Sequence, residues 1–401
     1  MNRPPSTPLL LLLFLVTVGC RDANKAKSFE QMVDRIGAHY VGDRRTDRFE
    51  IEHASGYRGL TVRGYTTVPA AYDSLRGALA TGFVVARNDF RLLPDAAKLN
   101  GRTAGVVNVS VANLRSEPGH SQELATQALL GTPLQVLDER DGWYLVRTPD
   151  RYLAWLEPGA FVALRPAAVR AWLTADLVRV VADRARVTTE PNGGTVVTEV
   201  TAGALLRRLA DAGTPAGGAA QAVALPDGVT GYVPAGALGE VTDWRDTLAP
   251  SQLVAAAATH RGTPYLWGGT SPKAVDCSGL TKTAYYDLGF VIPRDASQQV
   301  HAGDPVSLTE DLDQLAVGDL LFFGGYRADG SEKITHVGVY TGAGRFLHAG
   351  ADNGRVTEQS LLPGAPDYAA HRRESLLRAR RLSAGSPGVV RTWKAFADLV
   401  R

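Results

Sequence analysis

Two spacings of apolar residues alternate over the first hundred positions of this 401-residue chain. Residues 29–40 and 69–80 have apolar side chains at helical intervals, whereas residues 49–52 and 60–65 alternate between apolar and polar positions, as strands do. We find no group of residues suited to catalysis or ligand binding in this stretch. We therefore predict a small N-terminal α+β module with a structural role at residues 28–104.

Short alternating strands dominate from residue 105 to residue 240, and their pattern occurs twice. Each copy passes from a start motif through a Gly turn to a closing aromatic strand. The matching segments are residues 111–118 with 184–191 and residues 152–160 with 231–237. This order resembles the bacterial SH3-like barrel, so we expect one barrel at residues 105–165 and a second at residues 166–241.

The pattern changes again in the C-terminal part, where helical and strand spacings are mixed. Apolar residues at helical spacing mark one face of a helix that begins near Cys277. Residues 334–340 and 345–349 alternate as two strands around a Gly-rich turn. We predict an α+β domain at residues 249–382, followed by a tail at residues 383–401 that contains a short helix.

His336 and His348 lie one on each of these two strands. Side chains of paired antiparallel strands share a face only when the connecting loop has the right length. A loop of three or five residues pairs His348 with Gly338, on the same face as His336. A loop of two or four residues places the histidines on opposite faces. We therefore expect an odd-length loop.

The N-terminus has the pattern of an export signal. A short positive region precedes a nearly unbroken apolar run at residues 9–18, which is too short to span a bilayer and ends in Gly19-Cys20. We expect a lipoprotein signal peptide at residues 1–19, lipidation at Cys20, and a polar tether at residues 20–27. The protein is then exported and lipid-anchored in the bacterial cell envelope, on the periplasmic side. The alternative is an ordinary signal peptide with an incidental cysteine.

Composition narrows the class of protein. The chain has 45% hydrophobic and 21% charged residues and a net charge of +2, which is typical of a globular protein and provides no electrostatic basis for binding nucleic acid. Only two cysteines occur. If Cys20 carries lipid, Cys277 has no partner, and an unpaired thiol in an exported protein indicates chemistry.

The surroundings of Cys277 predict nucleophilic catalysis. Asp276 is a favourable N-cap, and the N–H groups at a helix start stabilise a thiolate and an oxyanion. On this interpretation Cys277 is the nucleophile, His336 the general base, and His348 orients the ring of His336. Two other interpretations remain open. Cys277 is a small buried hydrophobe, or the three side chains are metal ligands that lack a fourth partner. We predict no metal and no cofactor.

Several motifs then identify the family that this region resembles. In chain order they are residues 264–269, 276–280, 293–298, 318–323, 336–340 and 346–350. Together they resemble an NlpC-type cysteine peptidase with a papain-like fold. With two SH3-like barrels ahead of that domain, the chain is similar to the murein-peptide γ-D-glutamyl dipeptidyl-peptidases. The expected architecture is a multidomain α+β protein: a small α/β module, two SH3-like β-barrels, and the peptidase domain.

The resemblance also implies a reaction and a set of substrate contacts. The enzyme cuts between γ-D-Glu and the following diamino acid of peptidoglycan-derived peptides that begin with a free L-Ala, releasing L-Ala-D-Glu. The residues at the family's binding positions are Glu117, Tyr152, Tyr265, Asp276, Ser278, Asp295 and Ala296. A buried ammonium needs carboxylate partners, and Glu117 and Asp295 are suited to that role.

Other functions are compatible with the same residues. The domain could be an endopeptidase on the intact cell wall, with the barrels as wall anchors, or a wall-binding scaffold without activity. The presence of Cys277, His336 and His348 together argues against the scaffold. Amidase or acyl-transfer chemistry occurs on the same fold, and the triad does not exclude it.

Overall fold

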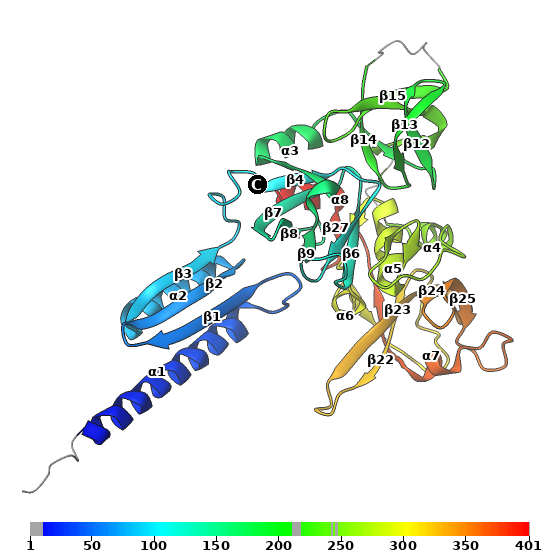
Figure 1. Ribbon diagram of the computed structural model, residues 1–401. Coiled ribbons are helices and arrows are strands. Elements are labelled where there is room, and N and C mark those ends of the chain that lie inside the picture. The colour runs from blue at the N-terminus through cyan, green and yellow to red at the C-terminus, as the bar shows by residue number, and fades with distance from the viewer. Residues whose placement is uncertain (1–10, 211–217, 242–243, 245–247, 401) are drawn as a thin grey trace, which may run out of the picture. The chain divides into compact units, whose positions relative to one another are not determined.

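The computed structural model describes residues 11–210, 218–241, 244 and 248–400, with side chains described from residue 26 onward (Figure 1). The chain divides into two compact units, Met1–Ala96 and Ala97–Arg401. Each unit is described by itself below.

The first unit is a three-stranded sheet with helices packed against it (Figure 1). β1 and β2 pair antiparallel, and β2 and β3 pair parallel. Phe29 and Ile36 of α1 share one core with Leu75 of α2 and Val62 of β2. The expected helices and strands of this region are therefore present. The elements are α1 (Leu11–Tyr40), β1 (Phe49–Gly56), β2 (Gly59–Thr66), α2 (Pro69–Gly82) and β3 (Val85–Leu92).

One detail of this unit differs from what the sequence predicted. Residues 20–27, expected as a tether, belong to α1, since the segment contains no Pro or Gly to end a helix. The side chain of Cys20 lies outside the described residues. Within the described residues, no helix is both long enough and apolar enough to cross a membrane.

The second unit begins at Ala97, not at residue 105. Lys98 forms an ion pair with Asp138 at 2.9 Å, and Leu99 is buried in the core of the first barrel. These contacts attach the segment before the first barrel strand to the barrel, and the compact N-terminal unit accordingly ends before residue 104.

The two barrels have the same topology, which confirms the repeat found in the sequence. The strand order is β10-β4-β7-β8-β9-β5-β6 in the first and β17-β11-β14-β15-β16-β12-β13 in the second, so each strand has its counterpart at the same place. Each barrel encloses its own apolar core. The helix α3 (Pro166–Leu173) connects them.

The first barrel consists of β4 (Ala104–Val107), β5 (Val111–Arg115), β6 (Leu124–Leu129), β7 (Pro133–Arg140), β8 (Trp143–Arg147), β9 (Leu153–Leu156), η1 (Pro158–Ala160) and β10 (Phe161–Leu164). The second consists of β11 (Leu177–Val180), β12 (Ala185–Glu190), β13 (Gly193–Val200), β14 (Leu205–Arg208), β15 (Ala220–Ala224), β16 (Thr230–Pro234), η2 (Ala235–Ala237) and β17 (Leu238–Glu240).

The repeated glycines are located where the barrels meet. Gly131 has φ 84°, and a Cβ on it would lie 2.4 Å from the backbone oxygen of Leu205 in the other barrel. Its counterpart Gly203 has φ 88°, and a Cβ on it would lie 2.7 Å from the Leu129 side chain of the first barrel. A left-handed backbone favours glycine at both turns, and at Gly131 the backbone of the other barrel leaves no room for a side chain.

The C-terminal domain, which the sequence predicted to be a peptidase, is built on an antiparallel sheet of order β21-β26-β22-β23-β24-β25. One face of this sheet packs on α5 through Val337, Val339 and Leu347. The opposite face packs through Phe323 and Phe346 in a separate core. In Figure 1, α4 and α5 lie beside the yellow to orange strands. This helix-on-sheet arrangement is the α+β architecture that the sequence predicted.

The domain's helices are α4 (Pro250–Ala258), α5 (Cys277–Asp287), α6 (Ala296–Gln299), α7 (Ala370–Glu374) and α8 (Thr392–Asp398). Its strands are β18 (Thr270–Ser271), β19 (Ala274–Val275), β20 (Phe290–Val291), β21 (Asp304–Val306), β22 (Leu320–Tyr326), β23 (Glu332–Gly342), β24 (Arg345–Gly350), β25 (Arg355–Ser360), β26 (Leu376–Arg381) and β27 (Val390–Arg391).

The C-terminal tail is part of the folded second unit. β27 pairs with β20, and the helix α8 follows directly. Phe396 of α8 is fully buried with Leu205 of the second barrel and with Trp244 in the segment that follows that barrel. The tail therefore joins the peptidase domain to the barrels.

Candidate active site

The hairpin β23–β24 places His336 and His348 on one face of the sheet through a β-bulge that was not expected from the sequence. Val339 pairs with Leu347, and this register continued by one residue sets Gly338 opposite His348. The turn itself has only two residues, because Gly342 pairs with Arg345, so the expected odd-length loop is wrong as stated. A bulge between Tyr340 and Gly342 adds the one residue that restores the predicted parity.

The two histidines are hydrogen-bonded to each other. His336 Nε2 lies 2.9 Å from His348 Nδ1, and their rings meet edge to face. His348 is fully buried and stacks on Phe346, while His336 is 6% exposed. Because His336 uses Nε2 for this bond, its Nδ1 is the nitrogen left for a reacting group.

Cys277 begins helix α5, as expected, and its position has a clear local cause. The Asp276 carboxylate caps the helix by accepting a hydrogen bond of 2.7 Å from the Gly279 N–H. Gly279 has no side chain because a Cβ there would lie 2.0 Å from the backbone oxygen of Gly269. The sequence Asp-Cys-Ser-Gly therefore starts the helix and seats it against the preceding loop.

The Cys277 thiol lies beside the strand that carries His336. The N–H groups of Val337 and Ser278 donate hydrogen bonds to the sulfur. Burial and the charge of Asp276 raise the pKa of this thiol to about 12, which outweighs those two bonds. Burial also holds the pKa of His336 well below its ordinary value, and the nearby Arg372 lowers it further. At rest the Cys277 thiol and the His336 imidazole are accordingly both neutral.

Gln359 is a site residue that was not expected from the sequence. Its Oε1 lies 2.8 Å from His348 Nε2, so it occupies the far end of the histidine pair. Gln359 comes from β25, where Phe346 is its direct partner and His348 a diagonal neighbour on the same face. No strand was expected at residues 355–360, and without that strand no sequence signal connects Gln359 with His348.

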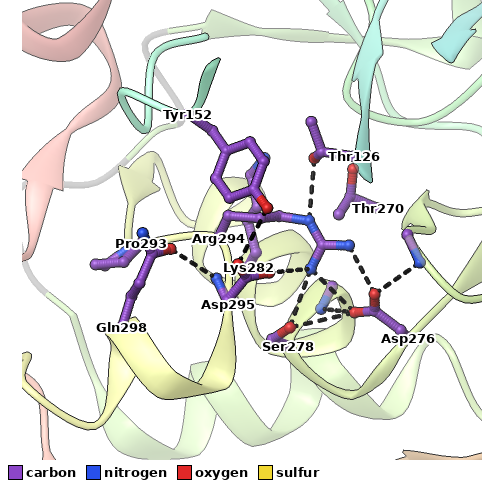
Figure 2. A network of polar contacts seen from close by, with 12 residues as sticks. Thr126, Tyr152, Thr270, Asp276, Ser278, Lys282, Pro293, Arg294, Asp295 and Gln298 are labelled. Atoms are coloured by element: carbon purple, nitrogen blue, oxygen red, sulfur yellow. Dashed lines mark hydrogen bonds and ion pairs between the residues drawn. The ribbon is translucent and has the colours of Figure 1, made fainter. Parts of the chain in front are cut away.

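A second missed residue, Arg294, organises the floor of the site (Figure 2). Its guanidinium is 1% exposed and donates to Asp276 through both Nη1 (3.1 Å) and Nη2 (2.6 Å). Nη1 also donates to Ser278 Oγ at 3.0 Å, and Nε donates to Thr126 Oγ1 in the first barrel at 3.0 Å. One arginine thus connects the helix start, the residue after the nucleophile, and the barrel.

This network uses the side-chain hydrogen-bonding groups of Asp276 and Ser278, which were expected to contact the substrate. Besides Arg294 and Gly279, the Asp276 carboxylate accepts from the Gly268 N–H at 2.9 Å. The Ser278 hydroxyl is buried and lies 3.3 Å from Asp276. Both side chains are held by internal bonds, so the expected substrate contacts at these positions are left to the backbone.

Tyr152 and Asp295 meet across the junction of barrel and peptidase domain. The Tyr152 hydroxyl donates to Asp295 Oδ2 at 3.1 Å, and Figure 2 shows the ring reaching down to the carboxylate. Asp295 is the N-cap of α6, and Ala296, the first residue of that helix, is buried. These three expected contacts are therefore brought together by the fold.

Glu117 has a separate setting. It forms an ion pair with Arg140, and its side chain is 53% exposed. The guanidinium of Arg140 lies 4.5 Å from the centre of the Trp155 ring. A substrate ammonium at Glu117 would compete with Arg140, a residue that the sequence analysis did not single out.

Tyr265 lies beside the nucleophile, in the segment before α5. It packs partly buried against the same core as Cys277. Burial, with the charges of Cys277 and Asp276, raises its pKa to about 12, so the hydroxyl keeps its proton and is available as a donor. Among the described residues, no group of three or more His, Cys, Asp or Glu side chains is placed to hold a metal ion.

Comparison with known proteins agrees with this geometry. Residues 262–371 match the NlpC/P60 family, and residues 114–161 match the bacterial dipeptidyl-peptidase Sh3 domain. Dipeptidyl-peptidase 6 of Lysinibacillus sphaericus is 32% identical over 270 residues, which cover 66% of this chain and 93% of that protein. The chain belongs to the NlpC/P60 family. It is thus a cysteine peptidase of that family, with a bacterial SH3 domain ahead of the catalytic one.

Two further proteins are similar to this chain, one in sequence and one in structure. Gamma-D-glutamyl-L-lysine dipeptidyl-peptidase of Bacillus subtilis is 42% identical over 97 residues, or 24% of this chain and 31% of that protein. The crystal structure of an NlpC/P60 family protein from Bacillus cereus superposes with a TM-score of 0.55 at 23% identity, covering 69% of this chain and 99% of that one. The latter shows that the fold is shared.

Proposed function

We propose that this peptidase hydrolyses the bond between γ-D-Glu and the following diamino acid in peptidoglycan-derived peptides with a free N-terminal L-Ala. The observation that carries the proposal is the contact of Tyr152 with Asp295, 3.1 Å apart, where the first barrel meets the catalytic domain. A carboxylate and a phenol side by side at this junction suit the terminal ammonium of a short peptide. The names of the relatives from L. sphaericus and B. subtilis support it.

In the first half of the reaction His336 acts as general base. Its Nδ1 takes the proton of the Cys277 thiol as sulfur attacks the carbonyl carbon of γ-D-Glu. The N–H groups in the first turn of α5 and the Tyr265 hydroxyl are donors to the oxyanion that forms. His336 then returns the proton to the nitrogen of the diamino acid, the C–N bond breaks, and L-Ala-D-Glu remains as a thioester on Cys277.

In the second half water replaces the leaving amine. His336 takes one proton from that water as its oxygen attacks the thioester carbon, and the C–S bond then breaks. The proton returns to the sulfur, and L-Ala-D-Glu leaves as a free acid. The same two groups thus serve both halves of the reaction.

The test measures how fast the protein without residues 1–20 cuts each of two peptides. L-Ala-γ-D-Glu-meso-diaminopimelate is cut to L-Ala-D-Glu, whereas the same peptide with its amine acylated is cut at least about 100-fold more slowly, because a site built for a charged group rejects the analogue without it. Cys277→Ala abolishes cutting. Equal rates on both peptides would instead identify an endopeptidase for intact wall, and no cutting would refute the peptidase assignment for murein peptides.

We also propose that Cys20 is lipidated and anchors the protein in the cell envelope. The apolar run at residues 9–18 before Gly19-Cys20 supports this. Cells that express the full chain and are fed a labelled fatty acid incorporate label into it, and Cys20→Ala removes both the label and the protein from the membrane fraction. Label that persists in the Cys20→Ala variant refutes this site.

A further inference from the structure

We propose that Gln359 is a positioning residue that sets the direction of the proton chain through His348 and His336, and thereby leaves His336 Nδ1 without a proton to act as the base toward Cys277. This inference rests on the proposed triad and adds to it a residue on a different strand. The structural feature behind it is a continuous line of polar atoms from β25 through His348 to His336.

The distances define that line. Gln359 Oε1 lies 2.8 Å from His348 Nε2, and His348 Nδ1 lies 2.9 Å from His336 Nε2. The line continues on the other side of Gln359, where Asn353 Nδ2 donates to the same Oε1 at 3.3 Å. Two of the three links are short and both histidines are buried, so competition from water is weak at these atoms.

Chemistry assigns the direction of each bond. An amide oxygen can only accept, so His348 Nε2 must carry the proton of its bond to Gln359. In a neutral ring the other nitrogen then has none, and His348 Nδ1 is an acceptor. His336 Nε2 must therefore donate to it, which leaves His336 Nδ1 as the bare, basic nitrogen. Turning the Gln359 amide around would reverse every bond and place a proton on Nδ1.

These bond directions hold only if the rings of His336 and His348 are both neutral, and the surroundings of the rings keep them so. Burial lowers the pKa of His348 to about 4 and that of His336 well below its ordinary value. The titratable groups near the pair are Asp352, His371 and Arg372. Asp352 forms an ion pair with Arg372 at 3.4 Å, which compensates its charge, and the His371 ring lies 3.2 Å from the same carboxylate.

Nuclear magnetic resonance of the wild-type protein tests the inference without any substrate. In protein labelled with ¹⁵N-histidine, the nitrogen shifts and proton couplings distinguish the two neutral tautomers of each ring. We expect both His336 and His348 to carry their proton on Nε2 at pH 7. A proton on Nδ1 of either ring overturns the proposal, whatever peptide the enzyme proves to cut.

Substitutions then connect the tautomer with the rate. Gln359→Leu removes the acceptor, so the His336 tautomers become mixed and kcat falls about 10- to 100-fold with KM little changed, the loss typical when a partner that orients a histidine is removed. Gln359→Glu keeps an acceptor-only group, so the tautomers and most of kcat are retained. Gln314→Leu is the control, because it makes the same change at an exposed position of the domain. It leaves the His336 tautomers and kcat unchanged.

The rate of Cys277 alkylation by iodoacetamide provides a readout that is independent of the peptide substrate. We expect Gln359→Leu to slow it and Gln359→Glu to restore it. If Gln359→Leu keeps the wild-type tautomers and kcat, the residue has no positioning role. If Gln359→Glu is as impaired as Gln359→Leu, the role of Gln359 is not to accept a hydrogen bond from the Nε2–H group of His348. If the wild type is alkylated normally but leaves the murein peptide uncut, the proposed substrate fails while this inference stands.

Discussion

At the scale of single residues, the proposed nucleophile Cys277 and its proposed base His336 rest as neutral groups. A thiolate at Cys277 would be desolvated and close to Asp276, and an imidazolium at His336 would be desolvated and close to Arg372. Each ion is thus disfavoured by burial and by a neighbouring like charge. Proton transfer from sulfur to nitrogen then belongs to the attack itself.

The pH dependence of the reaction follows from these shifts. His336 must be neutral to act as base, so kcat/KM is constant near neutral pH and falls only as the pH drops through the lowered pKa of His336, well below 6.5. Iodoacetamide alkylation of Cys277 rises with pH through the alkaline range, because the thiol pKa is raised to about 12. Alkylation that is already at its maximum near pH 7 would reveal a preformed ion pair and contradict this prediction.

At the scale of elements, the start of α5 depends on a buried ion pair between Asp276 and Arg294, which lies two residues before α6. Arg294 and Asp276 are 1% and 9% exposed in their side chains, and Nη2 and Oδ2 are 2.6 Å apart. Asp276 caps the helix while Arg294 neutralises it, so the nucleophile is held in place by a carboxylate whose charge is compensated. Neither partner can be lost without leaving the other charged and buried.

We therefore predict that Arg294→Met lowers the free energy of unfolding by roughly 3–5 kcal/mol, the usual result of breaking one side of a buried pair. Chemical denaturation measures it. Arg207→Met, at an exposed arginine of β14, serves as control and changes stability by less than about 0.5 kcal/mol. Adding Asp276→Asn to Arg294→Met should recover part of the loss, and no recovery would mean that the damage lies in packing.

At the scale of the whole second unit, the first barrel and the peptidase domain are joined by buried polar contacts. Thr270 and Gln127 exchange three hydrogen bonds of 2.9–3.1 Å across the junction. Lys282 of α5 pairs with Asp150 of the barrel at 2.7 Å, and the Asp150 side chain has no exposed surface. The barrel is thereby fixed on the catalytic domain, at the junction where Tyr152 also meets Asp295.

Lys282→Met should weaken this junction in a pH-dependent way. In the wild type, Lys282 holds the pKa of Asp150 below 3.8 despite burial, so the pair's stabilisation is present above pH 3.8 and is lost as the pH falls through the lowered value. Without Lys282, burial raises the pKa of Asp150.

The variant is therefore less stable by roughly 3–5 kcal/mol at pH 7 and recovers as the pH falls and Asp150 takes up a proton. Urea denaturation at several pH values measures this. Lys333→Met, at an exposed position of β23, is the control. A Lys282→Met deficit that stays constant between pH 7 and pH 4 would show that the pair does not govern the junction.

The order of elements and the central chemistry could be predicted from the sequence. The helix at Cys277, the strands with His336 and His348, and the repeat of two barrels depend on local spacing, on caps and on turns, which act over a few residues. The hairpin shows the limit of such reasoning. Its two-residue turn and its bulge offset each other, so the predicted pairing was right although the predicted loop length was wrong.

The sequence by itself determined which residue types were available for catalysis and the elements that carry them, because periodicity and motif spacing are properties of the chain. Tertiary structure alone decided that Gln359 meets His348, that Arg294 joins Asp276 to the barrel, and that Tyr152 reaches Asp295. Each of these contacts joins separate strands or domains. Their partners are selected by packing, which has no signature in the local pattern of the chain.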